Sequence, residues 1–442
     1  MSRSIHAANL LQRLPARMAS VLHVVARLAD PQGVKIFLVG GVVRDLLLRR
    51  PTFDLDLAVE GDGVAMARLI ADHFRASLTV FDRFATARLQ FPGGLRVDIA
   101  TTRKESYALP AELPQVGPAS LAEDLYRRDF TINAMAIQLN AGHVGQLIDY
   151  YGGEKDLRNR TIRVLHTKSF EDDPTRIFRA IRFEQRFKGR LETKTRRCLQ
   201  DAAATRLIDR LSGPRLCNEW FLLFAERDPS RAMDRLAQLK LFRFLHAQLH
   251  YNVHTKRMIH VLPKVLAWWT KRFPSGPLDR SVLYLMALLE GRSEIVVEGV
   301  IARLMLSNEQ AKKVRTSGGK PACILPVLGG ANNLRPSELY HLLVELAEEA
   351  LVLLLAKSVA EKRAGQLGRA QRRVFHFMTR LRGSRTALRG SDLLQMGMEP
   401  GPQIKDCLTR LLDARLDGTV RTRAQERAFV QARLSASLSS SE

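Results

Sequence analysis

The segment TFDLDLAVEG (residues 52–61) decides the fold prediction, because it sets two carboxylates into a pattern typical of a β-strand. Side chains alternate across a strand, so Asp54 and Asp56 are expected on one face and the neighbouring leucines on the other. Their stems would stand roughly 6.6 Å apart, which lets them hold two Mg²⁺ ions about 3.5–4 Å apart. The solvated face of an amphipathic strand would look the same, so the motif alone leaves both interpretations open.

The charge balance predicts a polyanionic partner. The 442 residues include 69 Lys and Arg against 45 Asp and Glu, a formal net charge of +24. Such an excess favours nucleic acid or an anionic membrane surface. The longest apolar runs are far shorter than the roughly 18 residues of a membrane span, so we expect nucleic acid and no membrane. The four cysteines show no paired spacing, which predicts neither a disulfide frame nor a zinc site and favours a cytoplasmic protein with reduced thiols.

The pattern along the chain predicts an α+β fold. Short β-rich runs separated by Gly, Pro and Asp fill the first third, as expected for a mixed β-sheet with flanking helices. From about residue 166 onward, apolar residues recur at helical spacing, including one long run at 337–363. Residues 317–337 are rich in Gly and Pro and predict a loop that divides the helical part. The oligomeric state is not predicted.

A pair of glycines precedes the acidic strand, in FLVGGVVRDLLLRR (residues 37–50). An apolar strand meets Gly40 and Gly41, and a helix then begins. Paired glycines let the backbone approach a ligand, and amides near a helix start favour phosphate. Arg44 could add a charge-assisted contact to a triphosphate. A tight strand-to-helix turn with a surface pair between Arg44 and Asp45 fits the same residues, and no Walker loop is present.

Downstream, EDLYRRDFTINAMAI (residues 123–137) gathers charge beside an apolar run. Arg128 could contact a phosphate while Asp129 bonds a ribose hydroxyl. An ordinary surface ion pair, with a contribution under about 1 kcal/mol, is the alternative.

A fourth segment, EDDPTRIFRAIRF (residues 171–183), combines acids with a stripe of arginines. Arg176, Arg179 and Arg182 follow one another at three-residue steps on a predicted helix. They could form a solvated or RNA-facing stripe. Asp173 with Arg176 would also present an acceptor and a donor that match a base edge.

Together with VDIATTRKESY (residues 97–107), these segments in this order closely resemble the class II tRNA nucleotidyltransferase and bacterial poly(A) polymerase family. The resemblance is strong over residues 34–190 and weaker towards the C-terminus. It implies an N-terminal DNA polymerase beta-like nucleotidyltransferase head with a mixed β-sheet, followed by an all-α neck, body and tail. The corresponding boundaries are 1–165 for the head, 166–240 for the neck, 241–380 for the body and 381–442 for the RNA-binding tail.

The resemblance also implies a catalytic site. Asp54 and Asp56 would be catalytic and carry Mg²⁺, and Asp98 could be a third carboxylate or a structural acid at a strand end. Arg103 and Glu105 match the family's R-x-E element. The implied nucleotide-binding residues are Gly41, Arg44, Arg128, Asp129, Asp173, Arg176, Arg179 and Arg182.

The implied reaction is attack of an RNA 3′-hydroxyl on the α-phosphate of a nucleotide, with release of pyrophosphate. The implied partners are tRNA, through its 3′ end and acceptor/T stem, and ATP and CTP, which Asp173 and Arg176 would read. The sequence departs from the family at Asp172, where Glu is usual, and in residues 106–120, a loop with few charges. Addition of CCA, of CC alone or of A alone therefore stays open.

Two alternatives remain. A poly(A) polymerase would use the same chemistry, but residues 81–91 lack the Gly-Arg-Arg-Phe-like run of that branch, which favours tRNA. A non-catalytic RNA-binding protein with a relic head is disfavoured by the intact pair of Asp54 and Asp56.

Overall fold

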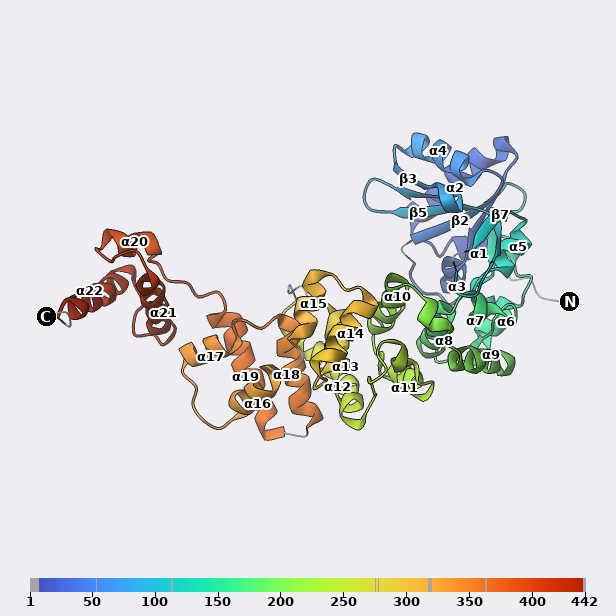
Figure 1. Cartoon of the computed structure of the whole chain (residues 1–442). Helices are drawn as coiled ribbons and strands as arrows, with labels where there is room; N and C mark the ends of the chain where they lie inside the picture. The colour runs from blue at the N-terminus through green and yellow to red at the C-terminus, as the bar shows by residue number, and fades with distance from the viewer. Residues whose placement is uncertain are drawn as a thin grey trace. The chain divides into compact units, whose positions relative to one another are not determined.

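The chain folds into a β-sheet unit and a helical unit (Figure 1). The computed structural model describes residues 8–439 except 53, 113, 275, 277, 317–319 and 362–363. The first unit consists of residues 1–223 and 235–244, and the second of 224–234 and 245–442. Phe53, which the sequence pattern placed beside Asp54, lies outside the described residues. The predicted α+β class, a mixed-sheet head followed by helices, is confirmed. The finer boundaries at 165, 240 and 380 stay predictions.

The first unit is built on a mixed seven-stranded sheet in which β2 holds a central place. The strand order is β3-β4-β5-β2-β1-β8-β9. β2 runs parallel to β5 and antiparallel to β1. The strand bounds are β1 (Lys35–Val39), β2 (Asp54–Glu60), β3 (Ser77–Phe81), β4 (Thr86–Gln90), β5 (Arg96–Thr101), β8 (Ala136–Gln138) and β9 (Leu147–Ile148).

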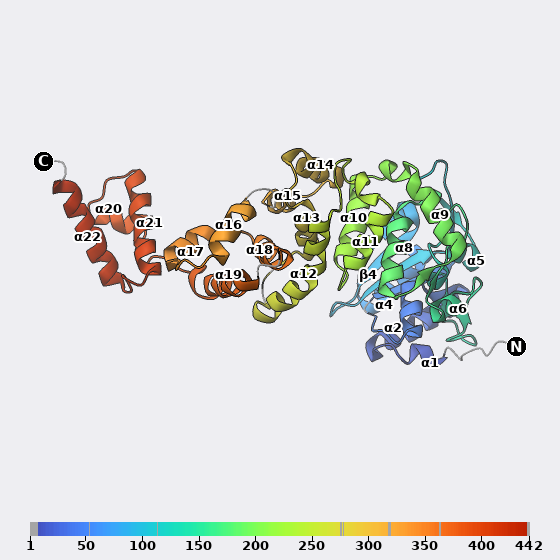
Figure 2. The ribbon, with the colours of Figure 1, turned by 90° about the horizontal axis from the view of Figure 1, so that it is seen from below.

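The two faces of the sheet are covered unequally. α2 (Ala16–Ala29) and α4 (Gly63–Phe74) lie side by side along the sheet (Figures 1 and 2). On the face that Ala58 shares, α5 (Leu121–Tyr126) packs Leu121 and Leu125 into a buried cluster. Because side chains alternate along β2, Asp54 and Asp56 lie on this same face, before the part that α5 covers.

Shorter elements complete the first unit. Residues 106–120, expected to be a loop, begin and end in a β-hairpin, because β6 pairs antiparallel with β7. The remaining bounds are α1 (Ala8–Leu11), α3 (Gly41–Leu47), β6 (Arg103–Ser106), β7 (Gln115–Pro118), α6 (Gly153–Arg158), β10 (Thr161–Ile162), α7 (Ser169–Asp172), α8 (Thr175–Arg186), β11 (Arg190–Leu191), α9 (Thr193–Ala204), α10 (Gly213–Phe224) and α11 (Ser230–Gln238). Helix α10 ends at the first residue of the second unit, whereas α11 starts in the second unit and ends in the first.

The second unit is helical, and one sequence prediction about it is wrong. The apolar run that begins at residue 337 is helical as predicted, in two helices that are interrupted where Ala347 adopts an extended backbone. The predicted loop at 317–337 contains α16, because the apolar Leu325 and Leu328 are buried there and packing outweighs the Gly and Pro signals. The bounds are α12 (Val253–Arg272), α13 (Arg280–Leu289), α14 (Glu294–Leu304), α15 (Asn308–Arg315), α16 (Lys320–Gly329), α17 (Pro336–Leu343), α18 (Glu348–Ala360) and α19 (Ala364–His376).

The last helices have a core of their own. They are α20 (Gly390–Gln395), α21 (Pro402–Leu416) and α22 (Arg423–Ser439), and Figure 2 shows them packed together. Leu393, Leu411 and Val430 are fully buried among them. None of the described helices is long and apolar enough to cross a bilayer.

Candidate active site

The acidic pair lies on β2 as the alternation predicts. Asp54 and Asp56 are exposed, and Leu55 between them is buried. In the parallel register with β5, Asp98 is the direct partner of Asp56. Paired residues of neighbouring strands project to the same face, so three carboxylates gather on one side of the sheet. The sequence left Asp98 open as a third carboxylate or as a structural acid at a strand end, and a role in metal binding stays a prediction.

Arginines neutralise two of these three acids. Arg96 donates to Asp54 with a nitrogen–oxygen distance of 2.8 Å, and Arg88 donates to Asp98 at 2.7 Å. Asp56 makes no hydrogen bond or ion pair with any residue that the structure describes. Of the three acids, Asp56 therefore has the negative charge that is least neutralised by neighbouring side chains.

The pKa of Asp56 is accordingly raised above its ordinary value. The largest cause of the raised pKa is burial of the carboxylate among protein atoms, although part of the side chain stays exposed. The negative charges of Asp98 and Asp54 raise the pKa further. Arg128 opposes the rise. A site that holds like charges together favours a cation, and carboxylate oxygens are the ligands that Mg²⁺ prefers. Within the described chain no three His, Cys, Asp or Glu side chains are already gathered as a metal site. Mg²⁺ often takes only one or two carboxylates and completes its shell with water and substrate phosphates, so the pair fits this ion.

The glycine turn brings the backbone close to an arginine. Gly40 has φ of +76°, and a Cβ there would lie 2.8 Å from Nη1 of Arg128. The left-handed backbone therefore favours glycine here, and a Cβ would press on the Arg128 guanidinium. Arg44 is buried and donates to Asn133 at 2.6 Å and to Asp45 at 2.8 Å. The pairing with Asp45 is confirmed, and the same guanidinium still lines a cavity.

This cavity of about 600 Å³ opens beside Asp56, and its size is ordinary for a small-molecule site. Of the predicted site residues, Asp54 and Arg182 are absent from its lining. Arg182 is buried, with its guanidinium 5.1 Å from the ring centre of Phe183. The predicted residues that do line the cavity are Gly41, Arg44, Asp56, Arg128, Asp129, Asp173, Arg176 and Arg179, and Arg103 and Glu105 join them.

Asp129 belongs to a buried network rather than to a surface ion pair. Its Oδ2 accepts from Arg179 Nε at 2.8 Å, and its Oδ1 accepts from Asn133 at 2.9 Å. Burial pushes the pKa of Asp129 up, but Arg179 and Asn133 outweigh it, so that the pKa lies below the ordinary value. The surface-pair reading is therefore wrong for Asp129. Both its oxygens already accept bonds from the protein, which leaves a ribose contact as a prediction.

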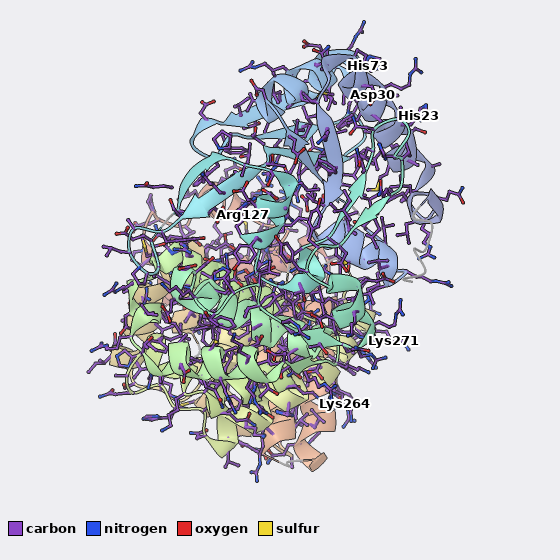
Figure 3. All side chains as sticks on the ribbon, turned by 90° about the vertical axis from the view of Figure 1, so that its right-hand side faces the viewer. His23, Asp30, His73, Arg127, Lys264 and Lys271 are labelled. Carbon is purple, nitrogen blue, oxygen red and sulfur yellow. The ribbon has the colours of Figure 1, made fainter. Side chains whose placement is uncertain are left out.

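Two neighbouring arginines anchor the wall of the cavity. Arg127 donates to Glu105 at 2.8 Å and to Asp124 at 2.7 Å, and Arg128 donates to Asp124 at 2.9 Å. Figure 3 shows Arg127 near the helices that follow the sheet, with His73 and Asp30 at the far end of the head. The two arginines thus share one buried acid, which fixes them beside the cavity.

Arg176 and Asp173, the pair predicted to read the base, differ in their contacts with the protein. Arg176 is buried and donates to Ser169 Oγ at 2.7 Å and to the carbonyl of Arg127 at 2.8 Å. The solvated-stripe reading is therefore wrong for Arg176. Asp173 is half-buried, and its Oδ1 accepts from Thr175 and from Arg215. Its Oδ2 is the atom left to face a ligand in the cavity.

Sequence reasoning missed Arg215 and Glu219, both on α10. Arg215 lines the cavity, donating to Asp173 at 2.9 Å and to the carbonyl of Ala111 at 3.0 Å. Glu219 is buried near Arg179 and Arg182, and burial raises its pKa despite these two charges. Neither residue stands in a sequence spacing typical of a functional motif, and only contacts with residues distant in sequence reveal them.

The geometry agrees with comparisons to known proteins. Residues 36–163 match a family described as the poly A polymerase head domain, and residues 190–252 match a probable RNA and SrmB-binding site of polymerase A. An A-adding tRNA nucleotidyltransferase of Geobacter sulfurreducens is 36% identical over 96% of this chain and 47% of its own length. One from Halalkalibacterium halodurans is 29% identical over 97% of this chain and 96% of its own length. The match to a further A-adding tRNA nucleotidyltransferase, from Aquifex aeolicus, covers only 31% of that protein's length.

Solved structures agree over nearly the whole chain. A CCA-adding enzyme in an apo form superimposes with a TM-score of 0.80 at 32% identity, covering 97% of this chain and 99% of that one. The Thermotoga maritima CCA-adding enzyme complexed with tRNA gives a TM-score of 0.76 at 31% identity, covering 97% and 98%. From these matches and the order of its motifs, the chain belongs to the class II tRNA nucleotidyltransferase and poly(A) polymerase family.

Proposed function

We propose that this chain is an enzyme that transfers nucleotides from ATP and CTP to the 3′ end of tRNA. The observation that carries the proposal is Asp56, an unpaired carboxylate at the edge of a nucleotide-sized cavity lined by arginines. Similar structures support the choice of substrates, because they include a complex with tRNA and complexes with ATP and with CTP. Addition of the terminal A is the step we expect first, since the relatives named above are A-adding or CCA-adding enzymes.

The acidic strand would serve the reacting end of the RNA. Asp54 and Asp56 would hold Mg²⁺, which when bound acidifies the 3′-hydroxyl and neutralises the departing pyrophosphate. Asp98 stands beside them, and Arg96 links it to Asp54 because its guanidinium forms an ion pair with both carboxylates. Positioning of the two substrates and neutralisation of the developing negative charge would then supply most of the rate enhancement.

The cavity wall would serve the nucleotide. Arg128 stands at the Gly40 turn, where its guanidinium can neutralise the triphosphate. Asp173 can accept a hydrogen bond from the exocyclic amine that adenine and cytosine share, and guanine and uracil lack an amine at that position. Arg176 is held by its two protein acceptors and would present a fixed edge to the base.

Arg215 sets the position of Asp173, so its loss should weaken base selection. We expect Arg215→Ala to lower the preference for ATP over GTP, as a ratio of kcat/KM, by about tenfold, since one oriented hydrogen bond contributes about 1–2 kcal/mol of selection. Steady-state extension of tRNA with each nucleotide checks this. Arg210→Ala removes an exposed arginine from the same region as a control. An unchanged preference would show that Asp173 is oriented without Arg215.

A gel that resolves single-nucleotide extension tests the function. The substrates are a tRNA transcript without CCA, one ending in C and one ending in CC, each with CTP or ATP alone. Extension of the CC-ending tRNA by one A is expected. Extension of the shorter tRNAs with CTP, together with this A addition, would identify a full CCA-adding enzyme. Extension with CTP but no A addition would identify a CC-adding enzyme, and A addition alone an A-adding one. No extension of any substrate would contradict the proposal and favour an RNA-binding protein with a relic head.

A poly(A) polymerase is the second candidate, because the family description of the head is shared between the two activities. In the same gel it would add a long A tail to an unrelated RNA. The tRNA relatives favour a single addition instead. We further propose a cytoplasmic location, where tRNA is matured. All four cysteines are free in the structure, as reducing conditions require.

A further inference from the structure

A second cavity in the first unit carries a large excess of cations over carboxylates in its lining. Its volume is about 710 Å³, and seven of its lining side chains are Arg or Lys against a single carboxylate, Glu154. Its floor is apolar and includes the buried Ile132 and Ile162. It shares no lining residue with the cavity beside Asp56. The excess of cations over an enclosed floor is the electrostatic pattern of an anion site.

Three of these cations stand in a strained backbone conformation. Arg49, Arg160 and Lys188 have φ of +55°, +53° and +49°. Side chains with a Cβ disfavour this left-handed region, and glycine usually occupies it after a helix. Each of the three directly follows the C-terminal cap residue of a helix, α3, α6 or α8 respectively. At three helix ends a long cationic side chain therefore occupies a backbone conformation that glycine would adopt with less strain. All three cationic residues line the same cavity.

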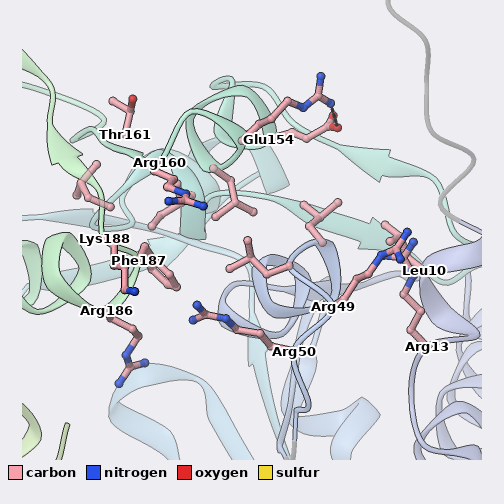
Figure 4. A pocket seen from close by; sticks show the side chains of 16 residues that line it. Leu10, Arg13, Arg49, Arg50, Glu154, Arg160, Thr161, Arg186, Phe187 and Lys188 are labelled. Atoms are coloured by element: carbon pink, nitrogen blue, oxygen red, sulfur yellow. Dashed lines mark hydrogen bonds and ion pairs between the residues drawn. The ribbon is translucent and has the colours of Figure 1, made fainter. Parts of the chain in front are cut away.

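The charges of these three residues have no carboxylate partner among the described residues. Figure 4 shows Arg50, Arg160 and Lys188 among the side chains that line the cavity. Arg160 and Lys188 are brought together by the pairing of β10 with β11 and by Gly189, where a Cβ would lie 2.4 Å from the carbonyl oxygen of Arg160.

One aromatic ring contacts an arginine from each of the two cavities. Arg44, which lines the nucleotide cavity, lies 5.3 Å from the ring centre of Phe187. Arg50, which lines the second cavity, lies 5.1 Å from the same ring. A ligand that draws Arg50 away would therefore change the contacts of the ring on which Arg44 rests.

We propose that this second cavity is a phosphate-binding site, separate from the catalytic one. Local strain that persists in a folded protein often marks a functional site, and here the strained residues supply the unpaired charge that a phosphate group would neutralise. The phosphate could be carried by an RNA strand or by a free polyphosphate. This inference goes beyond the proposed function and does not depend on nucleotide transfer.

The test uses the full chain and a double variant, Arg160→Asn/Lys188→Asn. Asparagine tolerates the left-handed conformation, so the variant removes both charges while keeping the turns. Arg75→Asn/Lys240→Asn is a matched control, because Arg75 and Lys240 are also exposed, left-handed cations of the first unit but lie outside the cavity. Titration calorimetry with tripolyphosphate should give two sites per wild-type chain, two in the control and one in the cavity variant.

Binding of tRNA then distinguishes the two sources of phosphate. If RNA occupies the site, the cavity variant should bind tRNA at least about tenfold more weakly, and the slope of log affinity against log salt should fall by about two. If a free polyphosphate occupies it, the lost tripolyphosphate site should leave tRNA affinity unchanged. A cavity variant that binds both tripolyphosphate and tRNA like the wild type and the control would overturn the proposal, and would mean that the cations only complement the helix ends.

Discussion

Replacing Asp56 by Asn is expected to abolish nucleotide transfer and to stabilise the fold at the same time. The variant should lose at least about a thousandfold in kcat, or roughly 4 kcal/mol, because the removed carboxylate would hold the ion that stabilises the transition state. Without divalent metal, its melting temperature should rise, since burial and the two neighbouring acids raise the pKa of Asp56 and so disfavour its charged form in the folded state. Extension of CC-ending tRNA and thermal unfolding in EDTA measure the two effects.

Asp72→Asn is the control for this substitution, because Asp72 is an exposed acid on α4 away from the cavity. It should change neither activity nor melting temperature. An Asp56→Asn variant that keeps wild-type activity would remove Asp56 from the mechanism. A variant that loses activity because it unfolds would contradict the electrostatic explanation.

Replacing Asp129 by Ala should have the largest effect on stability. Asp129 is buried, and it pairs with Arg179, whose side chain is 33% exposed. Removal of one partner from a buried pair typically costs about 3–5 kcal/mol, and we expect about 3 kcal/mol because Arg179 retains contact with water. Urea unfolding of the first unit checks this. Asp209→Ala, which breaks an exposed pair with Arg206, should change the free energy of unfolding by less than about 1 kcal/mol.

Asp129 should also make the free energy of unfolding depend on pH. The folded pKa of Asp129 lies below its ordinary value, so its stabilisation is complete above the unfolded pKa of about 3.9. The stabilisation is lost as the pH falls through the lower, folded pKa. The difference in stability between wild type and Asp129→Ala should therefore shrink on acidification. A difference that is constant from neutral pH to about pH 3 would show that the effect is one of packing and not of charge.

The acidic strand could be predicted from sequence because its signal is local. Asp54 and Asp56 alternate with leucines, and a period of two fixes their common face whatever the rest of the chain does. Their partnership with Asp98 depends instead on the parallel register of β2 and β5. Register is a property of two strands, so the sequence left Asp98 with two readings.

The wall of the site was harder to predict because its contacts are distant in sequence. Arg215 reaches Asp173 across 42 positions, and no periodicity links them. The resemblance placed Arg176 and Arg179 near the nucleotide, but it could not show that Ser169 and Asp129 already hold their guanidinium groups. The helix α16 was missed for a related reason, since its glycine- and proline-rich flanks hid apolar residues that only tertiary packing buries.

The measurement that most directly tests the central claim follows pyrophosphate and RNA in one reaction. Wild-type protein, CC-ending tRNA, ATP and Mg²⁺ should release one pyrophosphate for each A added, and the Asp54→Asn/Asp56→Asn variant should bind the same tRNA with unchanged affinity but release none. Extension of tRNA by that variant at the wild-type rate would place the chemistry elsewhere and contradict the account.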